Sequence, residues 1–157
     1  MLIGYPSKDF PGPPHIAMPL PENWAGVHLP DTLFAVRDAD GESDFVSNIV
    51  VRARRHAPQS AAELFEALTT QTASNEVERR EMFDLDPPVL YRVVQTRVDG
   101  QDISQHHMLA LVEQSETELM WAVSIVGSAG SGDDTKIAVI SKTLRETRVG
   151  YPSYDAE

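Results

Sequence analysis

One segment of the chain, Phe45–Arg55, alternates in side-chain character with a period of two residues. That period is typical of a half-buried β-strand, because successive side chains of a strand point to opposite faces of its sheet. The sequence Ser60-Ala61-Ala62-Glu63 follows and matches a capping box, the hydrogen-bonded start of a helix. A strand that leads into a capped helix predicts a fold in which helices pack on a sheet. The side chains that share one face of the strand are those of Phe45, Ser47, Ile49, Val51 and Ala53.

The rest of the chain predicts mainly further strands. Asp99-Gly100, between two β-rich segments, is the strongest hairpin signal in the sequence. Asp133 or Asp134 can cap a second helix that ends near Arg145. We therefore expect an α+β fold, an αβα sandwich in which an antiparallel β-sheet of about six to seven strands carries two main helices. The predicted strands are His15–Leu20, Thr32–Arg37, Phe45–Arg54, Glu76–Asp84, Val89–Val98, Gln101–Glu113 and Glu118–Val126.

The segment Gly127–Gly132 precedes the second helix and resembles a phosphate-binding loop in its glycine content alone. No Gly-Lys-Ser or Gly-Lys-Thr follows it, and the carboxylates of Asp133 and Asp134 stand where helix amides would attract an anion. We expect a flexible loop there. The serines also lack a Gly-x-Ser-x-Gly motif, so the sequence shows no acyl-transfer site, and we predict no catalytic residues.

His106-His107 is the only pair of adjacent histidines in the chain. Adjacent strand residues point to opposite faces, so the two imidazoles cannot bind one metal ion together, and we predict no metal site. A pocket between helix and sheet is an alternative role for this region, and a deep apolar pocket with converging polar groups would support it. Its predicted lining is Tyr91, His106 and Trp121.

The composition argues against several classes of protein. The formal net charge of -11 disfavours binding to nucleic acid or to anionic membranes, since both reward clustered cations. Without cysteine, the 157-residue chain has neither disulfides nor thiol nucleophiles, and its length suits one domain. The first residues lack the features of a signal peptide, and no apolar run approaches the ~20 residues of a membrane helix. We expect a cytoplasmic location and no membrane insertion.

The two ends of the chain are expected to be arms around a single domain of residues 15–148. Seven of the eleven prolines lie between Met1 and Pro30, and they predict a flexible arm over residues 1–14. Residues 149–157 form the predicted C-terminal tail. Both ends contain the sequence Gly-Tyr-Pro-Ser, so Tyr5 and Tyr151 belong either to disordered tails or to segments that bind a protein partner.

Three arginines near the end of the first alternating strand, Arg52, Arg54 and Arg55, form a small basic patch. The ordinary interpretation is a solvated surface with a few ion pairs. The alternative is a contact with an anion or with an acidic partner. Because Ile49 and Val51 belong to the predicted core, these arginines are the side chains of the strand that remain available to a partner.

A resemblance to a known family rests on the order of the predicted elements and on a few short segments. The chain resembles the PsbP-like superfamily, and within it is most similar to the LpqN-type proteins of actinobacteria. The resemblance implies an αβα sandwich that serves as a binding accessory, usually without enzymatic activity. The chain departs from the lipoprotein members because it has no cysteine to carry a lipid. The segments concerned are Met18–Trp24, Phe45–Val51, which includes Asn48-Ile49, and Val89–Val93.

We therefore predict a non-catalytic, protein-binding accessory or scaffold module with an unidentified partner and a secretion- or envelope-related role. The alternative is a small-molecule-binding protein, or an enzyme, with a pocket between helix and sheet. A third hypothesis is a homodimer formed through a sheet edge or face. We expect no cofactor and no nucleic-acid partner.

Overall fold

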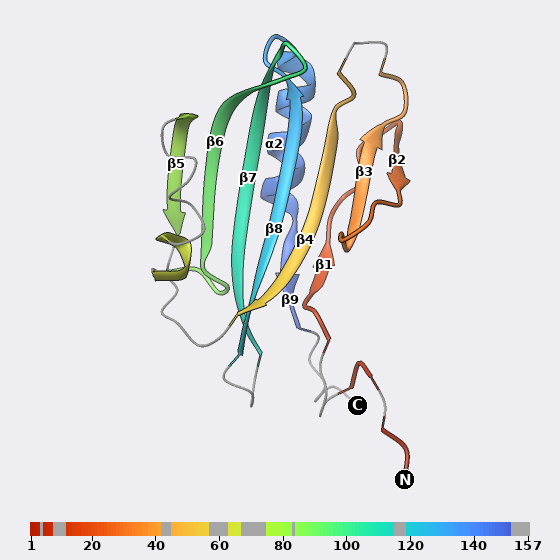
Figure 1. Ribbon diagram of the computed structural model, residues 1–157, viewed down its shortest axis with the longest axis vertical. Helices are drawn as coiled ribbons and strands as arrows, with labels where there is room; N and C mark the ends of the chain where they lie inside the picture. Colours follow the sequence, from red (N-terminus) through yellow and green to blue (C-terminus); the bar gives the residue numbers. More distant parts are fainter. Residues whose placement is uncertain are drawn as a thin grey trace.

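The computed structural model describes residues 1–3, 5–7, 12–41, 45–56, 63–66, 75–82, 84–114 and 119–151. Seven described strands form one antiparallel sheet in the order β2-β3-β4-β8-β7-β6-β5 (Figure 1). This sheet confirms the expected α+β fold and the expected number of strands. The strands are β2 (Trp24–Val27), β3 (Phe34–Asp38), β4 (Asn48–His56), β5 (Glu76–Met82), β6 (Val89–Val98), β7 (Gln101–Gln114) and β8 (Leu119–Gly130).

A second, two-stranded sheet brings together two segments from opposite ends of the chain. β1 (His15–Ala17) pairs antiparallel with β9 (Arg148–Gly150). Only the first half of the predicted strand His15–Leu20 is extended in this way, and Pro19, which has no amide hydrogen to donate, follows it. β2 and β9 are absent from the sequence-based prediction, because three or four residues are too few to show an alternation.

The hairpin predicted at Asp99-Gly100 is confirmed. The two residues have φ angles of 50° and 79°, the left-handed conformation that a tight two-residue turn requires. On either side of the turn, β6 and β7 pair from Val98 opposite Gln101 to Val89 opposite Ala110. β7 then pairs with β8, and β8 with β4, so the predicted strand around Ile49 is an interior strand of the sheet.

The predicted loop Gly127–Gly132 is wrong in its first four residues. These residues continue β8, and only Ser131 and Gly132 turn the chain toward the next helix. Gly127 is required by packing, because a Cβ atom added there would collide with the side chain of Ile140. Because Gly127 has no side chain, α2 can pack close to the sheet at this point. The sequence alone does not distinguish such a packing glycine from one in a flexible turn.

The helix α2 (Asp134–Glu146) covers one face of the sheet, which we call the α2 face. Asp133 caps it as predicted, since its carboxylate accepts a hydrogen bond of 3.2 Å from the backbone amide of Lys136. On the side of α2 that faces the sheet, Ile140 and Leu144 are buried in the main core. The strand residues that meet them include Ile49, Val51, Val123 and Ile125.

The opposite face, which Figure 1 turns toward the viewer, is called the front face here. It carries the short helical segment of residues 63–66, whose Leu64 and Phe65 are buried in a second apolar cluster. Helices thus lie on both faces, as the αβα sandwich requires. The segment belongs to the helix that the capping box predicts, although Ser60, Ala61, Ala62 and Leu68 lie outside the described residues. The sheet residues of this second cluster are Leu90, Leu111, Met120 and Ala122.

Candidate binding sites

A cleft lies on the α2 face, beside the helix. Because α2 packs mainly on β8 and β7, it leaves part of β5 and β6 uncovered on this face (Figure 1). The cleft has a volume of about 690 Å³, and small-molecule sites usually measure about 300–1,000 Å³. It is lined by Glu78, Arg80, Met82, Leu85, Asp86, Pro87, Val89, Tyr91, His106, Met108, Ser141, Leu144, Arg145, Thr147, Arg148 and Val149.

The pairing of β6 with β7 positions the polar centre of this cleft. Tyr91 lies opposite Met108, and Val93 lies opposite His106, so the two rings are diagonal neighbours on one face. The phenol oxygen of Tyr91 is 2.5 Å from Nδ1 of His106, and the ring centroids are 6.0 Å apart. The structure therefore brings together two of the three residues predicted to line a pocket between helix and sheet.

Burial keeps both partners of this pair uncharged at neutral pH. Desolvation raises the pKa of Tyr91 above its usual value, and a hydrogen bond with Ser141 opposes part of that increase. Desolvation also lowers the pKa of His106, against a smaller opposing effect of the Glu78 charge. Nε2 of His106 is buried and has no hydrogen-bond partner among the described residues. The cleft thus combines apolar walls with a neutral pair of hydrogen-bonding side chains.

The mouth of this cleft is charged, whereas its interior is not. Arg80, Arg145 and Arg148 supply cations, and Glu78 and Asp86 supply carboxylates. Such an arrangement can hold a molecule with an apolar body and a polar group, because apolar contacts provide affinity while a few polar contacts fix orientation. The described residues contain no group of three or more His, Asp or Glu side chains that could hold a metal ion.

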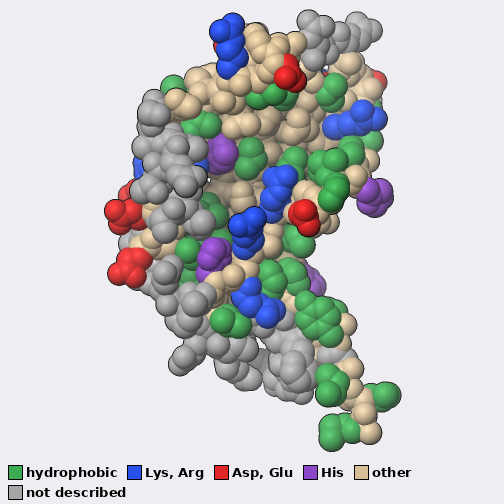
Figure 2. Space-filling model, in the orientation of Figure 1, with side chains coloured by type: hydrophobic (Ala, Val, Ile, Leu, Met, Phe, Trp, Pro, Cys, Tyr) green, Lys and Arg blue, Asp and Glu red, His purple; other side chains and the backbone are tan. Residues whose placement is uncertain are grey.

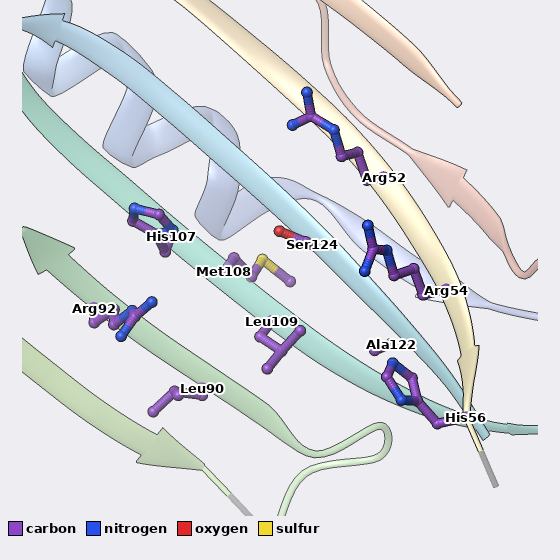
Figure 3. Close-up of a pocket in the computed structure, with 10 residues that line it drawn as sticks. All are labelled: Arg52, Arg54, His56, Leu90, Arg92, His107, Met108, Leu109, Ala122 and Ser124. Atoms are coloured by element: carbon purple, nitrogen blue, oxygen red, sulfur yellow. The ribbon is translucent and has the colours of Figure 1, made fainter. Parts of the chain in front are cut away.

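A second, smaller cleft of about 260 Å³ lies on the front face (Figure 3). Its lining residues come from four neighbouring strands, β4, β8, β7 and β6. Basic and histidine side chains gather in the middle of this face (Figure 2). The pKa of His107 is lowered to about 4, mainly by burial and also by the charges of Arg92 and His106. The lining is Arg52, Arg54, His56, Leu90, Arg92, His107, Met108, Leu109, Ala122 and Ser124.

The structure divides the predicted arginine patch between the two faces. Arg52 and Arg54 line the front cleft, but Arg55 points to the α2 face, because successive strand residues alternate. There the Arg55 guanidinium lies 4.8 Å from the ring centroid of Trp121, a distance suited to a cation–π contact. The Trp121 ring therefore packs against Arg55, and Trp121 does not line the cleft that contains Tyr91 and His106.

The two predicted tyrosine anchors have different environments. Tyr5 is exposed, together with Met1, Leu2 and Ile3. Tyr151 is partly buried, and its hydroxyl donates a hydrogen bond of 3.0 Å to the carbonyl of Gly12. Tyr151 thus connects the two ends of the described chain, while Tyr5 is presented to solvent.

Several residues that line the front cleft are not predicted as site residues from the sequence. Arg92 and His107 reach the front cleft because they pair across β6 and β7, and Ser124 because it pairs with Arg52 across β8 and β4. The Asp99-Gly100 turn could have identified the first of these pairs, since a two-residue turn determines the register of its hairpin. No comparable local signal exists for Arg52 and Ser124, which lie far apart in the sequence.

None of the helices in the described part of the chain is long and apolar enough to span a membrane.

No family model matches the sequence, and no curated protein is significantly similar to it. Among the solved structures that match its fold are two with the following similarities. LpqN, involved in cell envelope biogenesis of Mycobacterium tuberculosis, superposes with a TM-score of 0.69 over 89% of this chain and 86% of LpqN, at 9% identity. A protein from Bacteroides thetaiotaomicron VPI-5482 has a TM-score of 0.53 at 12% identity. That match covers 85% of this chain but only 44% of the other.

These identities support a statement about fold alone. The chain has an LpqN-like α+β fold, which confirms this part of the resemblance seen in the sequence. Membership of the PsbP-like superfamily, a cytoplasmic location and the domain bounds stay predictions.

Proposed function

We propose that this protein is a non-catalytic accessory module that binds a small amphipathic molecule in the cleft of the α2 face. The observation that carries the proposal is the cleft itself, about 690 Å³ in volume, with the Tyr91–His106 hydrogen bond at its centre. Its walls include Met82, Val89 and Leu144, which would contact the apolar part of the molecule.

The polar pair sets the chemistry of the ligand's other end. A phenol can donate one hydrogen bond and accept others, so Tyr91 can bond to His106 and to a ligand at the same time. Both side chains are neutral at pH 7, because a phenol is neutral at that pH and burial lowers the pKa of the His106 imidazole. We therefore infer an uncharged hydrogen-bonding group, such as a hydroxyl or an amine N–H, at this end of the ligand.

An envelope-related accessory role forms part of the proposal. Its support is the fold shared with LpqN, a protein involved in cell envelope biogenesis. The shared fold at 9% identity supplies the hypothesis, and the ligand test below is independent of it.

The experiment uses N-phenyl-1-naphthylamine, a neutral apolar fluorophore with one N–H group, as the probe. Its fluorescence should rise saturably on addition of the full chain, with a Kd of about 10 μM. The variant Ser141→Phe fills the cleft from α2 and should weaken binding at least about tenfold. Ala138→Phe is the matched control, since Ala138 is exposed on the same helix and does not line the cleft.

Two results would count against this function. One is the absence of saturable fluorescence. The other is equal binding by Ser141→Phe and Ala138→Phe, which would place the probe on an unspecific apolar surface. Circular dichroism melts of both variants establish that each one is folded.

A protein partner is the second candidate, favoured by the exposed N-terminal side chains. Leu2 is fully exposed, Ile3 is 73% exposed and Tyr5 is 66% exposed, so one short segment presents three apolar side chains to a partner. A photo-crosslinking amino acid at Tyr5 should capture one defined protein in the native cell, whereas the same group at exposed Val98 should not. Identical products from both positions would refute this candidate.

A further inference from the structure

We propose that the front face binds a phosphate monoester, with the phosphate held between Arg52 and Arg54 and the apolar part of the molecule on the neighbouring strands. The site goes beyond the ligand proposed for the α2 face and lies on the opposite side of the sheet. Three features of this face support the site, namely its charge, the register of its strands and the cleft that Figure 3 shows.

Between β3 and β6, the charge of the front face is opposite in sign to that of the whole protein. Directly paired residues of antiparallel strands share a face, so the register shows which charged side chains lie there. From β3 to β6 they are four arginines and one carboxylate, that of Glu113, in a chain of net charge -11. A cluster of this sign in an acidic protein favours a local anionic ligand. The four arginines are Arg37, Arg52, Arg54 and Arg92.

Arg52 and Arg54 are placed to share one anion. They are two residues apart on the same face of β4, so their Cα atoms are separated by roughly 6.6 Å, and two guanidinium groups at that spacing can reach one phosphate. Ser124 lies directly opposite Arg52 on β8 and adds a hydroxyl to the same end of the cleft (Figure 3). Two cations and a hydroxyl suit a phosphate monoester, which carries close to two negative charges at pH 7.

Neither of these guanidinium groups forms an ion pair with another described residue. The nearby carboxylates of the edge strand are already engaged, since Arg79 binds both Glu76 and Glu81. Glu113 lies beyond the arginines, opposite Met120, which itself pairs with His56. The charge that Arg52 and Arg54 offer is therefore not neutralised within the described part of the face.

The floor next to these arginines is apolar. Ala122 pairs with Arg54, and Leu109 pairs with Ser124. Apolar side chains therefore begin on β8, the strand next to the arginines. Leu90 extends this floor toward β6, where Arg92 closes the cleft. A volume of about 260 Å³ lies below the range of drug-sized ligands and suits a phosphate attached to a single ring or short chain.

The test is a titration of the full chain with phenyl phosphate at about 50 mM NaCl, followed by NMR of labelled Ala and Leu methyl groups. The Ala122 and Leu109 methyl signals should shift saturably, with a Kd of about 1 mM or tighter. Arg52→Gln and Arg54→Gln should each weaken binding at least about tenfold. Arg37→Gln removes the same charge from the same face, outside the cleft, and should change the Kd less than about twofold.

Other probes decide the chemistry. Inorganic phosphate should bind more weakly than phenyl phosphate, and phenol should not shift the signals. If all three arginine variants lost the same affinity for phenyl phosphate, the attraction would be a general effect of positive charge, and the proposed site would be refuted. Equal binding of phenylacetate would overturn the choice of phosphate, and tighter binding of a hexaglutamate peptide would assign the face to an acidic protein instead. No shift with phenyl phosphate would also refute the proposal.

Discussion

The two faces of the sheet are built from the same strands but differ in what covers them. On the α2 face, a capped helix buries Ile140 and Leu144 against the central strands and leaves a neutral, mainly apolar cleft at its side. On the front face, the described helical segment covers one end, and arginines stand over a shallow apolar floor. Because successive side chains of a strand alternate, one sheet presents mainly neutral and apolar side chains to one cleft and arginines to the other.

The largest expected effect concerns packing. Ile140→Ala removes a fully buried side chain from the α2 face and should lower the free energy of unfolding by about 4 kcal/mol. Leu109→Ala removes a half-buried side chain from the front face and should cost about 1 kcal/mol. Urea unfolding of both variants measures the contrast. Equal losses would show that the front face is packed as tightly as the α2 face.

The adjacent histidines allow the two faces to be compared by pH. Because burial lowers the pKa of His107 to about 4, its unfolded form binds a proton at higher pH than its folded form. Stability should therefore fall by up to about 3 kcal/mol as the pH drops from about 7 to 4, and His107→Gln should remove this part of the loss. Urea unfolding at several pH values checks it, with the exposed His28→Gln as control. A parent and a His107→Gln variant with the same pH dependence would contradict the prediction.

Two glycines of β8 test how closely the helix approaches the sheet. Gly127→Ala places a methyl group against Ile140 and should cost about 2 kcal/mol, because the helix must move away. Gly130→Ala introduces the same methyl group where no atom lies within 4 Å, and its effect should stay within about 0.5 kcal/mol. Thermal melts of both variants give the comparison. A neutral Gly127→Ala would show that the helix is not held close to the strand.

The smallest expected effect separates two neighbouring arginines. Arg55→Gln loses the cation–π contact with Trp121 and should cost about 0.5–1 kcal/mol. Arg54→Gln should be neutral within about 0.5 kcal/mol, since the side chain is exposed and unpaired among the described residues. Thermal melts in low salt resolve the difference. A larger loss of stability in Arg54→Gln than in Arg55→Gln would instead assign the structural role to Arg54.

The fold follows from sequence patterns wherever a pattern is local. The alternation around Ile49, the turn at Asp99-Gly100 and the cap at Asp133 each predict an element that the structure contains. The short strand β9 and the continuation of β8 through Gly127 do not follow, because pairing and helix packing determine them and neither leaves a local signal.

The two clefts are less predictable than the fold. The sequence predicts Tyr91 and His106 near one pocket, and the pairing of β6 with β7 brings the two side chains together. The sequence predicts Trp121 with them, but Trp121 packs with Arg55, a contact that depends on the β4–β8 register. A sequence shows which residues share a strand face, whereas a site also depends on which strands are neighbours.

One methyl NMR experiment with both probes tests whether the two faces of the sheet hold independent binding sites. N-phenyl-1-naphthylamine should shift the methyl signals of Leu144 and Val149 in the α2-face cleft. Phenyl phosphate should shift those of Leu109 and Ala122 on the front face. Each probe should bind with the same Kd whether or not the other is present. Competition between the two, or shifts of the same methyl groups by both, would contradict the assignment of two independent sites to the two faces of the sheet.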